Sequence, residues 1–251
     1  MPRYDFRAAR LHVAAPIGRG AALALDPGQA NYLRNVLRLR PGDPVVVFNG
    51  RDGEWRAVLA AGGKRSCTLT AEERLREQTP AGDLHLLFAP LKHARLDYLV
   101  QKAVEMGASR LQPVLTRHVQ VARVNLERMQ ANAVEAAEQC GILNLPEISA
   151  PTDLDRLLAE RDPGRLIVFC DEDAEVKDPI AALTAVRSDI GGAVPLAVLT
   201  GPEGGFSEEE RAALLKQPNV VRLALGPRIL RADTAAVAAL ALVQCVLGDW
   251  R

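Results

Sequence analysis

The sequence PLAVLTGPEGGFSEEE, residues 195–210, contains a strand, a loop and the start of a helix. Residues 195–199 form an uninterrupted apolar run that ends at Thr200. Such a run is typical of a strand buried on both faces. Ser207 is followed three residues later by Glu210, the spacing of a capping box, so a helix is expected to begin directly after Ser207. A strand that feeds a helix through a short loop is the repeating unit of an α/β domain.

The same alternation of apolar strands and helices extends over the chain from residue 83 onward. It predicts a mostly parallel sheet covered by helices on both faces, in which ligands bind at the carboxyl ends of the strands. Strands are expected at 84–89, 111–115, 166–170, 195–200 and 220–224, and helices at 94–106, 126–140, 179–186, 208–215 and 235–247.

Residues 1–74 have a different rhythm, with short strands and frequent turns that suggest a small barrel or sandwich. A polar segment at 72–82 is expected to link this domain to a second one at 83–251. Strands are expected at 45–48, 54–59 and 66–70. One helix is expected at 31–38, with Leu33, Val36 and Leu37 on its apolar face and Arg34 and Arg38 on another.

Charge is distributed unevenly, although the 31 basic and 31 acidic residues of the whole chain cancel. Residues 1–74 carry 12 Lys and Arg against 7 Asp and Glu, whereas the remainder carries 19 against 24. This asymmetry indicates either a polyanion that contacts one half only or chance variation of surface charge.

Composition and motifs exclude several classes of protein. With 48% hydrophobic and 25% charged residues, the 251-residue chain has the balance of a globular protein, and its longest apolar run, 235–248, is shorter than a membrane span. The amino terminus is charged where a signal peptide would be apolar, so a cytoplasmic location is expected. No P-loop, dinucleotide-binding or serine-hydrolase motif is present, which makes a metabolic dehydrogenase improbable.

Cysteine and histidine spacings give no sign of a metal site. The four histidines are isolated from one another. The four cysteines lie in apolar stretches without a C-x-x-C pair, and reduced thiols in the core are expected at Cys67, Cys140, Cys170 and Cys245.

Two loops carry residues that a simple turn does not explain. Three glycines lie within residues 201–205, where they would let backbone groups approach a ligand; a tight turn accounts for only one of them. After the strand at 220–224, Arg228 and Arg231 flank Ile229 and Leu230, two aliphatic residues that are expected to be buried. Asp233 or Thr234 is expected to cap the last helix.

Together, GPEGGFS at 201–207 and LGPRILRADTA at 225–235 resemble the ribosomal RNA small subunit methyltransferase E family, which belongs to the SPOUT class. Residues 92–107, 135–141 and 32–43 are similar to further motifs of this family, so the resemblance extends over nearly the whole chain. Two positions depart from the usual pattern: Asp233 replaces a glutamate, and Ile142 replaces an arginine.

The resemblance implies an amino-terminal PUA-like β-barrel that binds RNA and a carboxyl-terminal α/β domain with a trefoil knot. It implies methylation of N3 of one uridine in 16S (small-subunit) ribosomal RNA, with S-adenosylmethionine as the donor, no metal and a homodimeric enzyme. A SPOUT methyltransferase for another RNA, such as transfer RNA, and a non-catalytic RNA-binding protein of this fold are the alternatives.

Roles for individual residues are expected from the resemblance, from the chemistry of this reaction and from the basic charge of residues 1–74. Arg231, with Arg228, would stabilise negative charge on the uracil, and Glu203 or Asp233 would be the base if the reaction uses a carboxylate. Phosphate contacts are expected from the basic domain, at Arg3, Arg7, Arg10, Arg34 and Arg38. Cofactor contacts are expected at Leu199, Thr200, Gly201, Pro202, Glu203, Gly204, Gly205, Leu225, Gly226, Ile229, Leu230 and Thr234.

Overall fold

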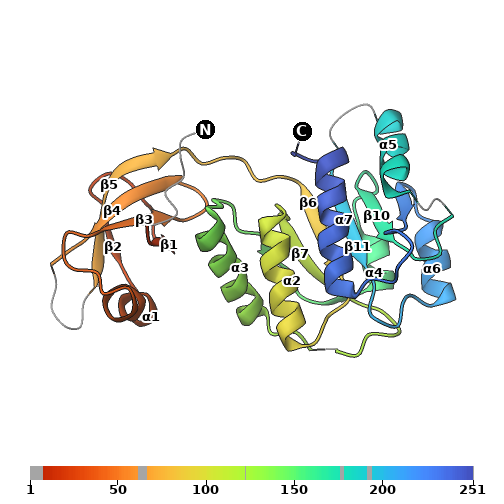
Figure 1. Cartoon of the computed structure of the whole chain (residues 1–251), viewed down its shortest axis with the longest axis horizontal. Helices are drawn as coiled ribbons and strands as arrows, with labels where there is room; N and C mark the ends of the chain where they lie inside the picture. The colour runs from red at the N-terminus through yellow and green to blue at the C-terminus, as the bar shows by residue number, and fades with distance from the viewer. Residues whose placement is uncertain (1–7, 62–66, 122, 176–177, 191–193, 251) are drawn as a thin grey trace. The chain divides into compact units, whose positions relative to one another are not determined.

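A computed structural model of the chain describes residues 8–61, 67–121, 123–175, 178–190 and 194–250. Contacts within the chain divide it into two compact units (Figure 1). The first unit comprises Met1–Pro80 and Ala137–Leu145, and the second comprises Ala81–Ala136 and Pro146–Arg251. Among the described residues, no helix combines the length and the apolar character that crossing a membrane requires.

The first unit is built on a five-stranded sheet with the order β1-β3-β4-β5-β2. Only β1 and β3 pair in parallel, and the other neighbours are antiparallel. Val45 and Val47 are fully buried on alternate positions of β3, as the period of two of a half-buried strand requires. The strands are β1 (Arg10–His12), β2 (Ala22–Ala24), β3 (Pro44–Phe48), β4 (Glu54–Leu59) and β5 (Thr68–Arg76).

The helix of this unit differs from the prediction for 31–38. A capping box between Asp26 and Gln29 starts α1 (Pro27–Asn31) four residues earlier, and a π-helical turn, η1 (Tyr32–Val36), follows it. The wider turn changes the spacing of the side chains, so Leu33 is buried whereas Val36 is 61% exposed and Leu37 is also exposed. The prediction of one continuous apolar face was therefore wrong.

The polar segment predicted as a linker begins later than expected. Its residues up to Arg76 belong to β5, where Arg74 pairs with Trp55 and Arg76 pairs with Glu54 of β4. Polar side chains are compatible with this strand because most residues at its end are at least partly exposed. The expected strand at 66–70 is the start of β5, and residue 66 lies outside the described residues.

The second unit contains a parallel sheet with the order β12-β10-β11-β6-β7-β8, and β9 pairs with β7. This arrangement confirms the predicted α/β class. The strands are β6 (Leu84–Phe88), β7 (Arg110–Leu115), β8 (Glu147–Ile148), β9 (Thr152–Asp153), β10 (Leu166–Cys170), β11 (Leu196–Thr200) and β12 (Val220–Leu223).

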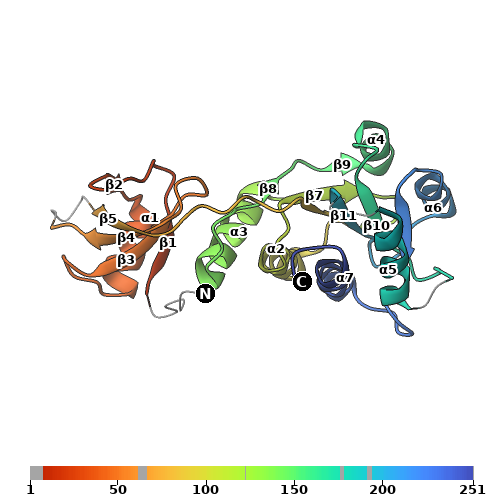
Figure 2. The same ribbon diagram turned by 90° about the horizontal axis from the view of Figure 1, so that it is seen from above.

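Helices cover both faces of this sheet. Figure 2 shows α2 and α7 on one side of the sheet and α4 on the other. The core on the α4 side includes Phe169, Leu199 and Leu87, which lie side by side on the neighbouring strands β10, β11 and β6. The helices are α2 (His93–Glu105), α3 (Leu126–Cys140), α4 (Leu154–Glu160), α5 (Pro179–Ile190), α6 (Glu208–Leu215) and α7 (Ala232–Val246).

The last helix begins earlier than predicted. Arg231 occupies the N-cap position, and Asp233 lies inside the first turn of α7, where its carboxylate accepts a hydrogen bond from the Thr234 amide. The prediction that Asp233 or Thr234 caps the helix was therefore wrong. A negative charge within the first turn still interacts favourably with the helix dipole.

The cysteines share neither burial nor environment. All four are free: Cys67 is buried, Cys170 is partly buried, and Cys140 and Cys245 are exposed. The prediction of four core thiols was wrong because residues near the ends of α3 and α7 can face outward despite their apolar neighbours. Burial raises the pKa of the Cys170 thiol to about 12, which keeps it protonated and unreactive.

Candidate active site

Strands β10, β11 and β12 bring two loops to one edge of the sheet. The glycine loop (residues 201–207) follows β11, and the arginine loop (residues 225–231) follows β12. Strand β10 lies between β11 and β12, and all three run parallel. Because neighbouring strands are ~4.8 Å apart, the two loops leave the sheet only about 10 Å from each other. The order of the strands thus places the two loops near each other, as predicted.

Glycine is required at two positions of the glycine loop. A Cβ at Gly201 would lie 2.6 Å from the ring of Phe206, which packs edge-on against Phe169 with the ring centroids 5.0 Å apart. Gly205 has φ +67°, a conformation that residues with a side chain rarely adopt. These constraints account for the glycines that a simple turn left unexplained.

Side chains from other elements hold the glycine loop in place. Nδ1 of His118, just after β7, lies 3.0 Å from the carbonyl oxygen of Gly204 and 3.3 Å from that of Gly205. Glu203 forms an ion pair with Arg95 of α2 at 2.7 Å. At its far end the loop enters α6 through the predicted capping box of Ser207 and Glu210.

A buried carboxylate contacts elements next to both loops. Asp171, directly after β10, accepts hydrogen bonds from Arg211 of α6 and from Arg222 of β12, each at 2.7 Å. Its side chain has no solvent exposure, and the two guanidinium groups supply the charge that burial of a carboxylate requires. Asp171 thereby ties the helix after the glycine loop to the strand before the arginine loop.

The arginine loop is more exposed than the sequence suggested. Arg228 and Arg231 are exposed, Ile229 is 95% exposed, and only Leu230 is partly buried. A Cβ added to Gly226, which has φ +85°, would meet no described atom within 4 Å, so this loop stands in open space. The prediction that Ile229 is buried was wrong for the single chain because no described side chain covers it.

Of the arginines predicted to contact RNA, Arg10 has a structural role instead. It is only 7% exposed, its Nε donates to Glu54 at 2.6 Å, and its guanidinium lies 3.8 Å from the centroid of the Phe48 ring. Burial alone would raise the pKa of Glu54, but hydrogen bonds from Arg76 and Arg10 outweigh this effect and hold the pKa below its usual value.

The other predicted RNA contacts are distributed differently. Arg38 is exposed and has φ +58°, directly after the π-helical turn, and Arg34 is partly buried. Arg3 and Arg7 lie outside the described residues.

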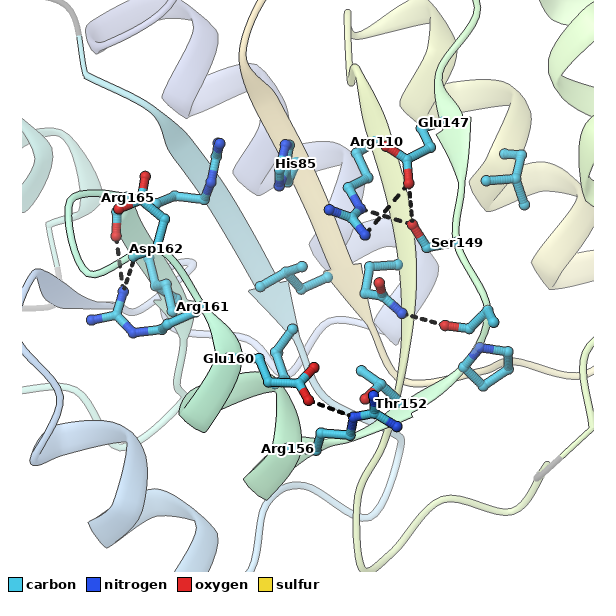
Figure 3. A pocket seen from close by; sticks show the side chains of 17 residues that line it. His85, Arg110, Glu147, Ser149, Thr152, Arg156, Glu160, Arg161, Asp162 and Arg165 are labelled. Atoms are coloured by element: carbon cyan, nitrogen blue, oxygen red, sulfur yellow. Dashed lines mark hydrogen bonds and ion pairs between the residues drawn. The ribbon is translucent and has the colours of Figure 1, made fainter.

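Cavities also occur in the described part of the second unit, and two of them bear on the predicted site. The larger, of about 620 Å³, lies near the amino ends of β6, β7 and β10, and none of the described residues predicted to bind the cofactor lines it (Figure 3). His85 points into it, and burial together with the charge of Arg165 lowers the pKa of His85 to about 4. A second cavity of about 460 Å³ lies beside the start of α6 and is lined partly by Thr116 and Arg117.

Comparisons with known proteins match both parts of the chain. A family described as an RNA methyltransferase domain matches residues 77–244, and a family described as an RNA methyltransferase PUA domain matches residues 25–72. Ribosomal RNA small subunit methyltransferase E from Synechocystis is 32% identical over 90% of this chain and 74% of its own length. The protein of the same description from Rickettsia conorii is 28% identical and covers 94% of both chains.

The chain belongs to the ribosomal RNA small subunit methyltransferase E family. Solved structures agree with this membership. A Legionella pneumophila protein described as a methyltransferase, solved with bound SAM, has a TM-score of 0.82 at 26% identity and covers 95% of this chain and 98% of that chain. The family member from Neisseria gonorrhoeae has a TM-score of 0.83 at 24% identity over 97% of this chain and 100% of that chain, which supports the fold.

His118 and Asp171 are the residues at this edge of the sheet that the sequence did not single out. Both follow directly or closely after a predicted strand of the parallel sheet, and the carboxyl end of a strand is where ligand-binding side chains are expected. This position was the available signal for both residues. Neither residue lies in a motif, so their contacts became visible only in the structure.

Proposed function

We propose that this protein transfers a methyl group from S-adenosylmethionine to N3 of one uridine in 16S ribosomal RNA. The observation that carries the proposal is the pair of loops at the ends of β11 and β12, in a chain that belongs to a ribosomal RNA methyltransferase family. The bound SAM in the Legionella pneumophila relative supports the choice of the methyl donor.

The residues present at the two loops fit such a donor. Gly201, Gly204 and Gly205 expose backbone groups that side chains would otherwise cover, and Leu225 and Leu230 are partly buried aliphatic residues suited to the faces of an adenine. We assign cofactor contacts to residues 199–205, to Leu225, Gly226, Ile229 and Leu230, and to Thr234 at the start of α7. When bound, S-adenosylmethionine supplies an activated methyl group on a sulfonium.

The protein's own contribution to the chemistry is positioning and fixed charge. Loss of the N3 proton spreads negative charge over the uracil oxygens, and the exposed guanidinium groups of Arg231 and Arg228 can stabilise that charge. Glu203 is less suited to accept the proton because its carboxylate is engaged by Arg95, and the carboxylate of Asp233 accepts from the Thr234 amide.

We assign RNA binding to a domain comprising residues 1–74 and catalysis to residues 83–251. Arg34 and Arg38 of the first domain would contact phosphates, so binding should weaken steeply with salt. Replacing both with glutamine should weaken RNA binding and reduce the salt dependence, whereas Arg156→Gln on α4, where Arg156 pairs with Glu160, should not. Unchanged RNA affinity in the double variant would contradict this assignment.

We also propose the knot and the homodimer that the family likeness implies. The 95% exposure of Ile229 supports the dimer, because a second subunit could cover this side chain. The protein would act on ribosomal RNA in the cytoplasm.

The proposal is tested by methylation of purified RNA. The protein should incorporate radiolabelled methyl groups from S-adenosylmethionine into 16S ribosomal RNA, either free or within the small ribosomal subunit, and nuclease digestion should yield 3-methyluridine. Labelling of transfer RNA instead would indicate another substrate, and RNA binding without any labelling would indicate a non-catalytic protein. Either result would contradict the proposal.

A further inference from the structure

The glycine loop selects one tautomer of the neutral His118 imidazole. Its Nδ1 lies 3.0 Å from the carbonyl oxygen of Gly204 and 3.3 Å from that of Gly205. A carbonyl oxygen can only accept a hydrogen bond, so Nδ1 must carry the proton. In the neutral ring Nε2 then has a free lone pair, and the part of the chain that the structure describes gives it no partner.

The acidic side chains nearest to His118 and the glycine loop are already engaged. Glu203 pairs with Arg95, and Glu209 pairs with Arg117 at 3.3 Å. Glu172, whose carboxylate lies beside Gly205, pairs with Arg211 at 3.6 Å. Glu210 accepts from the backbone amides of Ser207 and Arg117. These interactions occupy the carboxylates, and hydrogen bonds at the start of α6 together with the charge of Arg117 hold the pKa of Glu209 below its usual value. The exposed imidazole of His118 is held differently, with its acceptor nitrogen unoccupied.

We propose that Nε2 of His118 accepts the N3 proton of the target uridine during methyl transfer. This inference rests on the proposed function and names a residue for a step that the function requires. The N3–H bond breaks and its proton moves to Nε2, while the N3 electron pair forms the bond to the methyl carbon. The bond between that carbon and sulfur breaks, and the sulfur keeps the electron pair as a neutral thioether.

The glycine loop gives His118 its position. The carbonyl oxygens of Gly204 and Gly205 point their negative ends at Nδ1–H, so they orient the imidazole ring. A Cβ at residue 204 would lie 3.0 Å from the His118 Cβ, so the absence of a side chain allows this approach. Because the ring is exposed, water can remove the proton after each turnover.

The arrangement resembles that of other catalytic histidines, in which one ring nitrogen is oriented by an acceptor and the other transfers the proton. Glu209 of α6 lies close enough to His118 for their charges to interact, and it pairs with Arg117, the residue before His118. Glu210 of α6 accepts a hydrogen bond from the Arg117 amide. Glu210 also accepts a hydrogen bond from the Ser207 amide at the end of the glycine loop, so the proposed proton acceptor and the proposed cofactor loop are held by a shared set of contacts.

The variant His118→Asn tests this proposal. Its side-chain amide can still donate a hydrogen bond to the two carbonyl oxygens, but it has no group in place of Nε2. We expect kcat for methylation to fall by about 10²- to 10⁴-fold, with the Kd for S-adenosylmethionine and the KM for RNA changed by less than about threefold. His93→Asn, at an exposed histidine that begins α2 with φ +30°, is the matched control and should keep the wild-type kcat.

The dependence of the rate on pH provides a second measurement. Wild-type single-turnover methylation should slow toward low pH, and this decrease should be absent from the residual activity of His118→Asn. A wild-type kcat in His118→Asn, or a loss explained entirely by weaker S-adenosylmethionine binding, would overturn the proposal. The same pH profile in both proteins would also overturn it. If the wild-type protein does not methylate RNA, that result contradicts the proposed function on which the inference rests.

Discussion

Replacing Gly201 with alanine would place a methyl group against the ring of Phe206. The added Cβ would lie 2.6, 3.0 and 3.2 Å from three ring atoms, whereas carbon atoms in good contact are about 3.5 Å or more apart. The ring cannot retreat freely, because Phe206 is buried and packs against Phe169. Overpacking of this kind costs about 1 to 3 kcal/mol.

This strain should appear mainly as weaker binding of S-adenosylmethionine. The loop can relieve the clash by moving Phe206 and the backbone around Gly201, but binding the cofactor requires the original geometry. If the whole 1 to 3 kcal/mol must be restored on binding, the Kd rises by about 5- to 150-fold. Titration calorimetry with S-adenosylmethionine measures this change, and urea unfolding measures how much strain remains without the ligand.

Two further variants make the measurement specific. Gly18→Ala is the matched control, because a Cβ at Gly18 meets no described atom within 4 Å and its φ is not positive, so both affinity and stability should stay unchanged. Phe206→Leu should partly restore affinity to Gly201→Ala, with a favourable coupling free energy of about 0.5 to 3 kcal/mol in the double-mutant cycle. Wild-type affinity in Gly201→Ala, or additive effects in the cycle, would refute the reasoning.

Three other perturbations test separate parts of the structure. Glu54→Gln removes the carboxylate that Arg10 needs in its buried position, so it should destabilise the first unit by about 3 kcal/mol. Trp55 fluorescence during urea unfolding measures this loss. Glu73→Gln, in an exposed ion pair, should have little effect, and equal effects of the two variants would contradict the role of burial. The pKa of His85 is lowered to about 4 in the folded state, so the unfolded state binds more protons below pH ~6.5. The free energy of unfolding should therefore fall by about 1 to 2 kcal/mol between pH 7 and pH 5. The His85→Gln variant should lose less stability over this range, and an identical loss would refute the assignment. Arg231→Ala should lower the single-turnover rate of methylation by about 100-fold while S-adenosylmethionine still binds, and an undiminished rate would reject the role of this arginine.

Local patterns predicted the elements of the parallel sheet well. The capping box of Ser207 and Glu210 and the apolar run before it are complete within residues 195–210, so the strand, the loop and the helix could be read from neighbouring residues. The short strands β8 and β9 and helix α4 were not predicted. Each two-residue strand is too short to show a period and exists because β7 offers it a partner.

The errors concern residues whose environment depends on distant parts of the chain. Arg10 looks like any basic surface residue, but its hydrogen-bond acceptors include Glu54 and the carbonyl oxygen of Ile142, which are 44 and 132 residues away. Ile229 was expected to be buried because it is aliphatic, yet no residue that the structure describes covers its side chain. The π-helical turn at Tyr32–Val36 depends on a change of hydrogen-bond spacing that residue type alone does not show.

The candidate site was predicted in part, for a related reason. Glycine and arginine motifs indicated the two loops, because such motifs are contiguous in sequence. The contacts of His118 with Gly204 and of Asp171 with Arg211 and Arg222 join separate strands and helices, so no local pattern contains them.

Mass spectrometric mapping of uridines in 16S ribosomal RNA from cells that lack this protein tests methyl transfer most directly. One uridine should lose a single methyl group at N3, and the wild-type gene should restore it whereas the Arg231→Ala variant should not. An unchanged set of methylated uridines in the deleted strain would contradict the assignment of this protein as the enzyme that methylates that nucleotide.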